Sequence, residues 1–326
     1  MNVLLIGLGR WGEKHLRVLR ELGAVLWVAE VTPTRLAWAV AHGVPAKRAT
    51  ADYRSALGAV DAVDIVTPAD SHLAIASVCL AAGRHCFVEK PLTMNADEGR
   101  RLVAAADRAK RVVQVGHIFR FHPVTATLRL ALGAGRIGVV RYASGRFAGF
   151  KRPRTDVGVF QTDGIHCVDL FAHLLGREAT AATAVQRDFL GRGLDDLSVV
   201  TVTYGDVPVL IEADYFDPAI HRECVIVGER GALVADYGAG TVTLHAFEHV
   251  KTGAAWDALD RGKQELSVGR DEPLKLELAA FLDVCRANAA APVDARAGLH
   301  AVEVVDAAAR AARLGRTVSI AEIRAA

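Results

Sequence analysis

A glycine-rich turn near the start of the chain restricts the fold more than any other feature. An apolar run, Val3–Ile6, leads into Gly7-Leu8-Gly9-Arg10-Trp11-Gly12, and a helical pattern follows. This order is typical of the first unit of a dinucleotide-binding sheet. There Gly7 permits the tight turn, Gly9 lets backbone approach a pyrophosphate, and Gly12 lets helix and strand pack closely. Without its flanking strand and helix the motif would be weak evidence, because glycine-rich turns have other uses.

Apolar runs and helical patterns alternate over about the first 120 residues. Further strands are expected at Val25–Ala29, Ala62–Val66, His85–Glu89 and Val112–Val115, with helices between them. The runs are rich in Val, Ile and Leu without strict alternation, as strands buried on both faces are. The pattern predicts an α/β fold, with a doubly wound parallel Rossmann sheet over residues 1–120.

Strands dominate the second half of the chain. They are expected at Arg141–Gly149, Ser198–Tyr204, Val207–Tyr215, Arg222–Val227, Ala232–Asp236 and Thr241–His245. Helices are expected at Pro123–Ala134, Ile165–Leu175, Leu274–Asn288 and Ala295–Leu314. These elements predict an α+β domain with a mixed or antiparallel sheet over residues 121–326. The pattern leaves open whether the last helix packs back on the first domain.

Charge and composition argue against several classes of partner. The 39 Lys and Arg residues nearly balance the 37 Asp and Glu residues, which removes the electrostatic reason to expect nucleic acid or a membrane surface. No apolar run is long enough to span a bilayer, and Val3–Ile6 is too short for a signal peptide. We therefore expect a cytoplasmic protein.

The five cysteines are expected to be reduced and mostly buried. They are scattered and form no CxxC pair, so neither a disulfide framework nor a structural metal site is expected: Cys79, Cys86, Cys167, Cys224 and Cys285.

Glu30 indicates which dinucleotide the turn would bind. It ends the second strand, eighteen residues after Gly12, where an acidic side chain holds ribose hydroxyls. A carboxylate there repels the 2′-phosphate of NADP and favours NAD, with Arg10 and Trp11 of the turn beside the cofactor. Arg35 lies near enough in sequence to pair with a phosphate, so NADP stays an alternative. A solvated strand end is the other reading of Glu30.

Glu89-Lys90-Pro91 follows a strand directly. Ligands bind at the carboxyl ends of such strands, and a lysine there can polarise a carbonyl or stabilise an alkoxide. Taken alone, the tripeptide is also compatible with a surface turn.

A histidine in the second half has acidic neighbours at helical spacing. On a helix, His166 shares a face with Thr162, Asp163 and Asp169. A histidine is suited to accept a proton near neutral pH. The alternative is a packing histidine with helix-end acids.

Five motifs in order resemble the glucose–fructose oxidoreductase/inositol dehydrogenase (Gfo/Idh/MocA) family over essentially the whole chain. They are GLGRWGEKH at the start, Val66-Thr67-Pro68 with His72, the EKP tripeptide, GHIFRFHP at Gly116 to Pro123, and GIHCVD around His166.

The resemblance implies a Rossmann domain followed by a domain with a large open sheet that often serves oligomerisation, so a homodimer or homotetramer is expected. It implies Lys90 and His166 as catalytic residues, with His166 as the base. Many members carry Asp four residues before this histidine. Here that position is Thr162, and whether Thr162, Asp163 or neither assists catalysis stays open.

Further residues join these sites as expectations. Thr67, Pro68, His72, Glu89 and Lys90 are expected near the cofactor. The substrate side is expected to include Lys90, Asp163 and His166. His117 and Arg120 either contact substrate or brace the domain junction.

The substrate is expected to be a sugar-like secondary alcohol. The cations of Lys151-Arg152-Pro153-Arg154 suit a diphosphate or a carboxylate, although a solvated basic loop is the alternative. This segment and GHIFRF are similar to the nucleotide-sugar branch, which implies a substrate such as UDP-N-acetylglucosamine, oxidised to a keto sugar. An inositol or free-sugar dehydrogenase is the second reading, and a non-catalytic dinucleotide sensor is the third.

Overall fold

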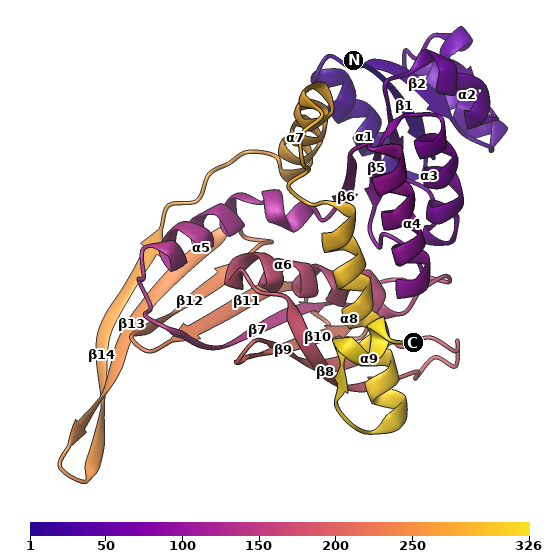
Figure 1. The fold of residues 1–326 in the computed structure, drawn as a ribbon. Helices are drawn as coiled ribbons and strands as arrows, with labels where there is room; N and C mark the ends of the chain where they lie inside the picture. Colours follow the sequence, from indigo (N-terminus) through magenta and orange to yellow (C-terminus); the bar gives the residue numbers. More distant parts are fainter. The chain divides into compact units, whose positions relative to one another are not determined.

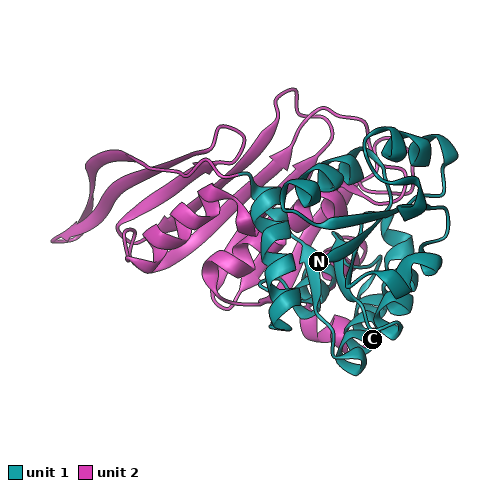
Figure 2. Cartoon of the chain, turned by 90° about the horizontal axis from the view of Figure 1, so that it is seen from above, with its two compact units in different colours: residues 1–118, 272–302 teal, residues 119–271, 303–326 magenta.

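The computed structural model describes residues 1–326, which divide into two units (Figure 2). Unit 1 comprises Met1–Ile118 and Glu272–Val302, and unit 2 comprises Phe119–Asp271 and Glu303–Ala326. The sequence pattern had placed all of residues 121–326 in the second domain. The structure differs because the chain returns to unit 1 for about thirty residues after Asp271.

Unit 1 contains the predicted parallel sheet, which confirms the Rossmann prediction. Its six strands lie in the order β3-β2-β1-β4-β5-β6. They are β1 (Asn2–Ile6), β2 (Val25–Ala29), β3 (Ala49–Thr50), β4 (Ala62–Ile65), β5 (His85–Glu89) and β6 (Val113–Gly116). The chain order reverses between β1 and β4, and ligands bind at such a switch point, beyond the carboxyl ends of the strands.

Helices cover both faces of this sheet (Figure 1). The helices of unit 1 are α1 (Arg10–Glu21), α2 (Pro33–Ala41), α3 (His72–Ala81), α4 (Ala96–Ala109) and α7 (Pro273–Ala287), with short helices η1 (Ala46–Arg48), η2 (Tyr53–Ala59) and η3 (Ala69–Ser71). α1 and α7 pack together on one face, and α3 and α4 pack together on the other.

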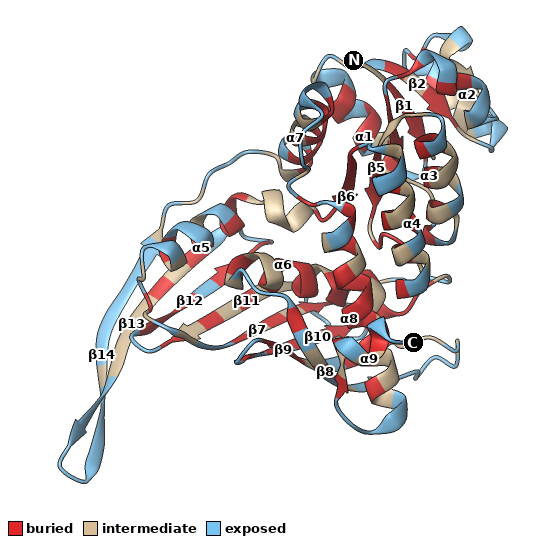
Figure 3. Cartoon of the chain, viewed as in Figure 1, coloured by how far each residue is buried: buried red, intermediate tan, exposed pale blue.

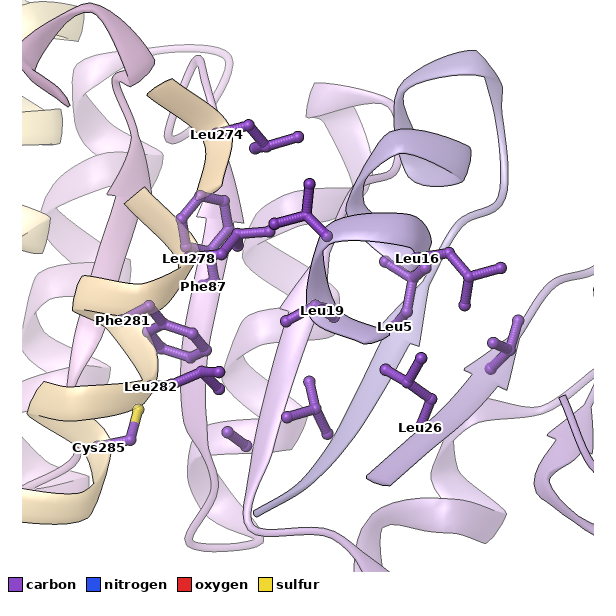
Figure 4. Close-up of a cluster of buried hydrophobic side chains, with 14 of the residues drawn as sticks. Leu5, Leu16, Leu19, Leu26, Phe87, Leu274, Leu278, Phe281, Leu282 and Cys285 are labelled. Atoms are coloured by element: carbon purple, nitrogen blue, oxygen red, sulfur yellow. The ribbon is translucent and has the colours of Figure 1, made fainter. Parts of the chain in front are cut away.

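A cluster of buried apolar side chains explains why α7 belongs to unit 1 (Figure 4). Leu16 and Leu19 of α1 lie in the same cluster as Leu278 and Phe281 of α7. The ring of Phe281 meets the ring of Phe87 from β5 edge to face, with centroids 5.6 Å apart. The apolar stripe of α7 therefore completes the cover of the parallel sheet.

Unit 2 contains a nine-stranded sheet in the order β14-β13-β12-β11-β7-β10-β9-β8-β15. The strands are β7 (Val140–Ala148), β8 (Ala179–Arg187), β9 (Leu197–Tyr204), β10 (Val207–Asp214), β11 (His221–Gly228), β12 (Gly231–Asp236), β13 (Thr241–Thr252), β14 (Ala255–Leu266) and β15 (Val318–Ser319). β7 and β10 are parallel, and the other neighbouring pairs are antiparallel. The mixed sheet confirms the predicted class of the second domain.

Helices of unit 2 cover one face of its sheet (Figure 1). They are η4 (Ile118–Phe121), which begins in unit 1, α5 (Pro123–Gly133), the short π-helical segment η5 (Phe160–Gly164), α6 (Ile165–Leu175) and α9 (Ile320–Arg324). α5 packs on β12 and β13, and α6 packs on β7, β9 and β10. α8 (Ala295–Leu314) begins in unit 1 and ends in unit 2.

Buried and exposed residues alternate along strands of this sheet such as β9 and β10 (Figure 3). In β10, for example, Val209 and Ile211 are fully buried, whereas Leu210 between them is 48% exposed. β13 continues well beyond the expected end at His245 and pairs with β14 in a long hairpin. All five cysteines are buried and free. None of the helices combines the length and the apolar composition that crossing a membrane requires.

Candidate active site

The glycine turn has the close contacts that its motif predicts. Gly7 has a φ of +92°, and a Cβ there would lie 2.4 Å from the Val66 carbonyl oxygen. A Cβ on Gly12 would lie 2.3 Å from the carbonyl oxygen of Gly7, so helix and turn touch only because Gly12 lacks a side chain. By contrast, a Cβ on Gly9 would meet no atom within 4 Å.

Gly9 is also the N-cap of α1, and no side chain caps this helix start. The backbone N–H groups there are therefore left for a ligand, and the helix dipole favours an anion. The open space beside Gly9 and the uncapped helix start fit the pyrophosphate of a dinucleotide.

Glu30 and Arg35 are both anchored to the glycine turn. The Glu30 carboxylate accepts the Leu8 N–H at 2.7 Å and the Thr32 N–H at 2.8 Å. Arg35 donates to the Leu8 carbonyl from Nε at 2.9 Å and from Nη2 at 2.6 Å, and it forms an ion pair with Glu13. The carboxylate is fixed at the end of β2, and the guanidinium already has partners.

His72 links the loops that follow β4 and β5. Its buried ring lies with Nε2 3.0 Å from the Thr67 carbonyl oxygen and Nδ1 2.9 Å from the Pro91 carbonyl oxygen. Burial lowers the pKa of His72. Thus His72 holds the TP segment against the segment of Lys90, at the carboxyl ends of adjacent strands. Arg10 and Pro68 are exposed on the same side of the sheet, at the ends of β1 and β4.

His117 belongs to unit 1, one residue beyond β6, and is 1% exposed. Its burial distinguishes it from the partly exposed Lys90.

In unit 2, His166 is the second residue of α6 and is partly exposed. Its ring packs edge to face on Phe119, with centroids 4.9 Å apart, and lies 5.9 Å from the ring of Phe147 in β7. These two aromatic rings hold the imidazole in orientation.

The helix before His166 differs from the expected α-helix. Residues Phe160–Gly164 form a π-helical turn, a feature that is frequent at functional sites. The α-helical spacing that placed Thr162 and Asp163 on one face with His166 therefore does not hold there. Instead, Thr162 donates to the Gly158 carbonyl at 2.8 Å, and Asp163 forms an ion pair with Lys151.

Asp169, the other acidic neighbour, is bound by Arg120. The guanidinium donates from Nε and Nη2 at 2.6 to 3.0 Å, and the Arg120 side chain is only 14% exposed. Arg120 therefore anchors η4 to α6 within unit 2.

The basic segment at residues 151–154 is largely neutralised by carboxylates. Besides the Lys151–Asp163 pair, Arg154 donates to Asp156 at 2.8 Å and lowers the pKa of that carboxyl. Arg152 is exposed and forms no ion pair or hydrogen bond.

Arg192 joins this group without a signal in the sequence. It pairs with the buried Asp196, and its guanidinium lies 5.8 Å from the ring of Tyr215. The Lys151 ammonium lies 5.6 Å from the same ring. Sequence analysis missed Arg192 and Tyr215 because only tertiary pairing brings them to the 151–163 segment.

His15 and Asp64 were also missed. His15 belongs to the GLGRWGEKH segment, and Asp64 is an acidic residue inside an apolar strand, which was the available signal. Both are fully buried, and their side chains lie 2.9 Å apart.

Comparisons with known proteins match both halves of the chain. A family model described as an oxidoreductase family with an NAD-binding Rossmann fold matches residues 1–117, and its C-terminal alpha/beta domain matches residues 130–320.

Two relatives and two solved structures illustrate the range of similarity. UDP-N-acetylglucosamine 3-dehydrogenase of Acidithiobacillus ferrooxidans is 34% identical over 57% of this chain and 58% of its own length. Its structure matches with a TM-score of 0.83 at 24% identity, covering 96% of this chain and 98% of that one. Inositol 2-dehydrogenase 2 of Saccharopolyspora erythraea is 31% identical over 75% of this chain and 73% of its own length. A levoglucosan dehydrogenase complex with NADH matches in fold, with a TM-score of 0.85 at 20% identity over 98% of this chain and 99% of that one.

Proposed function

This chain belongs to the Gfo/Idh/MocA oxidoreductase family, and we propose that it is an NAD-dependent dehydrogenase that oxidises a secondary alcohol of a sugar-like substrate. The observation that carries this proposal is that each unit contributes one residue suited to the chemistry. Lys90 begins the loop after β5 in the dinucleotide-binding unit, and His166 packs on the ring of Phe119 in the second unit.

In the proposed reaction, His166 accepts the proton of the substrate hydroxyl through its imidazole. The Lys90 ammonium stabilises the negative charge that develops on the same oxygen. When bound at the glycine turn, the nicotinamide supplies the acceptor for the hydride. The ion pairs of Asp163 and Asp169 orient the start of α6 and so orient His166. Thr162 and Asp163 serve as supports of this helix start.

The cofactor preference is for NAD. Support comes from the Glu30 carboxylate, which is fixed by two N–H groups at the end of β2, and from Arg35, whose guanidinium is engaged by Leu8 and Glu13. A 2′-phosphate would meet this carboxylate, and Arg35 is already held by other partners. Thr67, Pro68 and His72 follow β4 at the same edge of the sheet, and we expect them to border the cofactor together with Arg10 and Trp11 of the turn.

For the substrate, the first candidate is a UDP-sugar such as UDP-N-acetylglucosamine. Arg152 is exposed with no counter-ion, and Arg154 and Arg192 are near it in the same unit, which suits a diphosphate. The similarity to the A. ferrooxidans enzyme supports the same choice.

Inositol or a free sugar is the second candidate, because three of the four cations in this region already have carboxylate partners. A region with this charge balance also suits a neutral polyol. The relation to the S. erythraea inositol dehydrogenase supports this reading.

A substrate panel separates these candidates. Purified protein is mixed with NAD⁺ and, in parallel, with UDP-N-acetylglucosamine, UDP-glucose, myo-inositol and glucose, and the absorbance of reduced nicotinamide is followed. Turnover with a UDP-sugar, reduced by Arg152→Gln mainly through KM, supports the first candidate. Turnover with inositol or glucose alone, unchanged in Arg152→Gln, supports the second. No turnover despite NADH binding would favour a dinucleotide-binding protein without this activity.

We also propose that a second copy of the chain covers the open sheet face of unit 2. The strand registers place five exposed apolar side chains on that one face: Tyr142, Val185, Val199, Leu210 and Val234. Contiguous exposed apolar groups of this kind mark protein interfaces.

A further inference from the structure

We propose that His15 is a positioning residue that acts on Lys90 through Glu89. This inference rests on the proposed function, in which Lys90 is catalytic, and it adds a residue to that machinery. The observation behind it is a buried polar chain that runs from Asp64 in β4, through His15 in α1, to Glu89 at the end of β5.

His15 lies between two carboxylates. Its Nδ1 is 2.9 Å from Oδ2 of Asp64, and its Nε2 is 3.3 Å from Oε1 of Glu89. The ring is 0% exposed and is wedged edge-on between the rings of Trp11, at 5.8 Å, and Phe87, at 5.7 Å. Asp64 and Glu89 are the charged groups that face the ring, so it has no access to water and little freedom to rotate.

Glu89 connects His15 to the two neighbouring loops. Its Oε1 accepts the indole N–H of Trp11 at 2.8 Å, and its Oε2 accepts the backbone N–H of Lys90 at 3.1 Å. Trp11 belongs to the glycine turn. The Glu89 carboxylate therefore joins the glycine turn to the loop that begins at Lys90. His15 contacts the same carboxylate from α1.

The charges alternate along this chain. Burial alone disfavours a charged imidazole, but Asp64 and Glu89 outweigh it and raise the pKa of His15 to about 10. Burial also disfavours the Glu89 carboxylate, yet His15, Trp11 and Lys90 together lower the pKa of Glu89. Burial raises the pKa of Asp64, although His15 opposes that rise. Without the imidazolium, the buried Glu89 carboxylate would lose the group that lowers its pKa most and would take up a proton more readily.

A purely structural role explains this arrangement less well. Buried ion groups lose their hydration, and well-packed apolar residues often give equal or greater stability. The apolar cluster that includes Leu16 of the same helix shows that α1 can pack on the sheet by apolar contacts. The polar chain instead ends at Lys90, where the proposed chemistry needs a fixed charge.

The first test measures the amine of Lys90 directly and needs no substrate. Acetic anhydride labelling of Lys90, quantified by mass spectrometry at a series of pH values, gives the pH midpoint of its reactivity. It is measured in the wild type and in His15→Gln, Glu89→Gln and the double variant. Leu16→Ala, a buried change in the same helix away from the chain of charges, is the matched control.

We expect the midpoint to fall by about one pH unit in His15→Gln and in Glu89→Gln, because Lys90 loses a neighbouring carboxylate charge in both. The double variant should fall no further, and Leu16→Ala should keep the wild-type midpoint. A wild-type midpoint in a folded His15→Gln protein, or additive shifts in the double variant, would overturn the inference.

Kinetics provides a second readout with the sugar that gives turnover. The loss of kcat in His15→Gln should disappear in the Glu89→Gln background, as expected for residues that act as a unit. NADH binding and thermal unfolding establish that each variant is folded. The Lys90→Ala variant shows whether a negative result contradicts the proposed function or only the present inference. If it keeps wild-type turnover, the proposed function of Lys90 is wrong; if it is inactive while the His15 and Glu89 effects add, only the present inference is wrong.

Discussion

At the scale of single residues, the proposed preference for NAD over NADP rests on Glu30. Replacing it by Gln keeps the shape and removes the charge that would repel a 2′-phosphate. We expect kcat/KM with NADP to rise about tenfold relative to NAD, equivalent to about 1.4 kcal/mol.

Steady-state rates with both cofactors provide the measurement for Glu30→Gln. Arg35→Gln is the control, since loss of a cation near the same place should not favour NADP. If the Glu30 variant keeps the wild-type ratio, its carboxylate does not face the ribose.

The raised pKa of His15 predicts how the unfolding free energy of the protein depends on pH. Its folded-state pKa of about 10 lies above the ordinary value of 6.5, so the folded protein binds this proton more tightly than the unfolded chain. The stabilisation is complete below pH 6.5 and is lost as pH rises through 10. The gap in unfolding free energy between the wild type and His15→Gln should therefore narrow by about 1 kcal/mol or more between pH 7 and pH 10.

Urea unfolding at several pH values measures this gap. The corresponding gap for Leu16→Ala should stay nearly constant, because that change removes only apolar contacts. A gap for His15→Gln that does not vary with pH would mean that His15 is not charged in the folded protein.

Residue-level contacts were only partly predictable from the sequence. The types and order of Gly7, Glu30, Lys90 and His166 pointed to a dinucleotide site and to proton chemistry. The ion pairs were not predictable, because Lys151 and Asp163 or Arg120 and Asp169 meet only after folding. The surplus positive charge read from the 151–154 segment is therefore much reduced in the structure.

At the scale of elements, α6 is fixed by contacts two and three residues after His166. Arg120 binds Asp169, and the Tyr204 hydroxyl donates to the Val168 carbonyl at 2.8 Å. Arg120→Met removes the guanidinium that pairs with the buried Asp169 carboxylate and should cost about 3 kcal/mol of unfolding free energy.

Arg120→Met together with Asp169→Leu should recover much of that loss, because no charge is then left buried. Denaturant unfolding of the single and double variants is the measurement. Equal losses in both would show that the ion pair is not what fixes this helix.

Elements with a buried apolar face were predictable, and elements stabilised by pairing alone were not. β14 was missed because nearly all of its residues are exposed, and its backbone bonds to β13 replace burial as the source of its order. β8 is built mainly of Ala and Thr and has a weak pattern. α7 was expected as a helix, but an apolar stripe does not say which sheet it will cover. The π-helical turn before α6 lies outside the 3.6-residue period.

At the scale of the whole molecule, the open face of the nine-stranded sheet predicts self-association. Leu210→Asp places a charge at the middle of the exposed apolar side chains and should lower the mass measured by light scattering to that of the monomer. Leu130→Asp makes the same change at a 76% exposed position on α5, away from that face, and should not alter the mass. A wild-type protein that is already monomeric at micromolar concentration would contradict the proposal.

Lys90 and His166 belong to separate units, and the proposed reaction needs both, so their variants test it most directly. Turnover is compared in the wild type, Lys90→Ala and His166→Asn with the sugar that gives activity, while NADH binding is measured in each. We expect both variants to bind NADH normally and to lose about 100-fold or more in kcat, the usual contribution of a positioned acid or base. Near-wild-type kcat in both folded, NADH-binding variants would contradict the assignment of the dehydrogenase chemistry to these two residues.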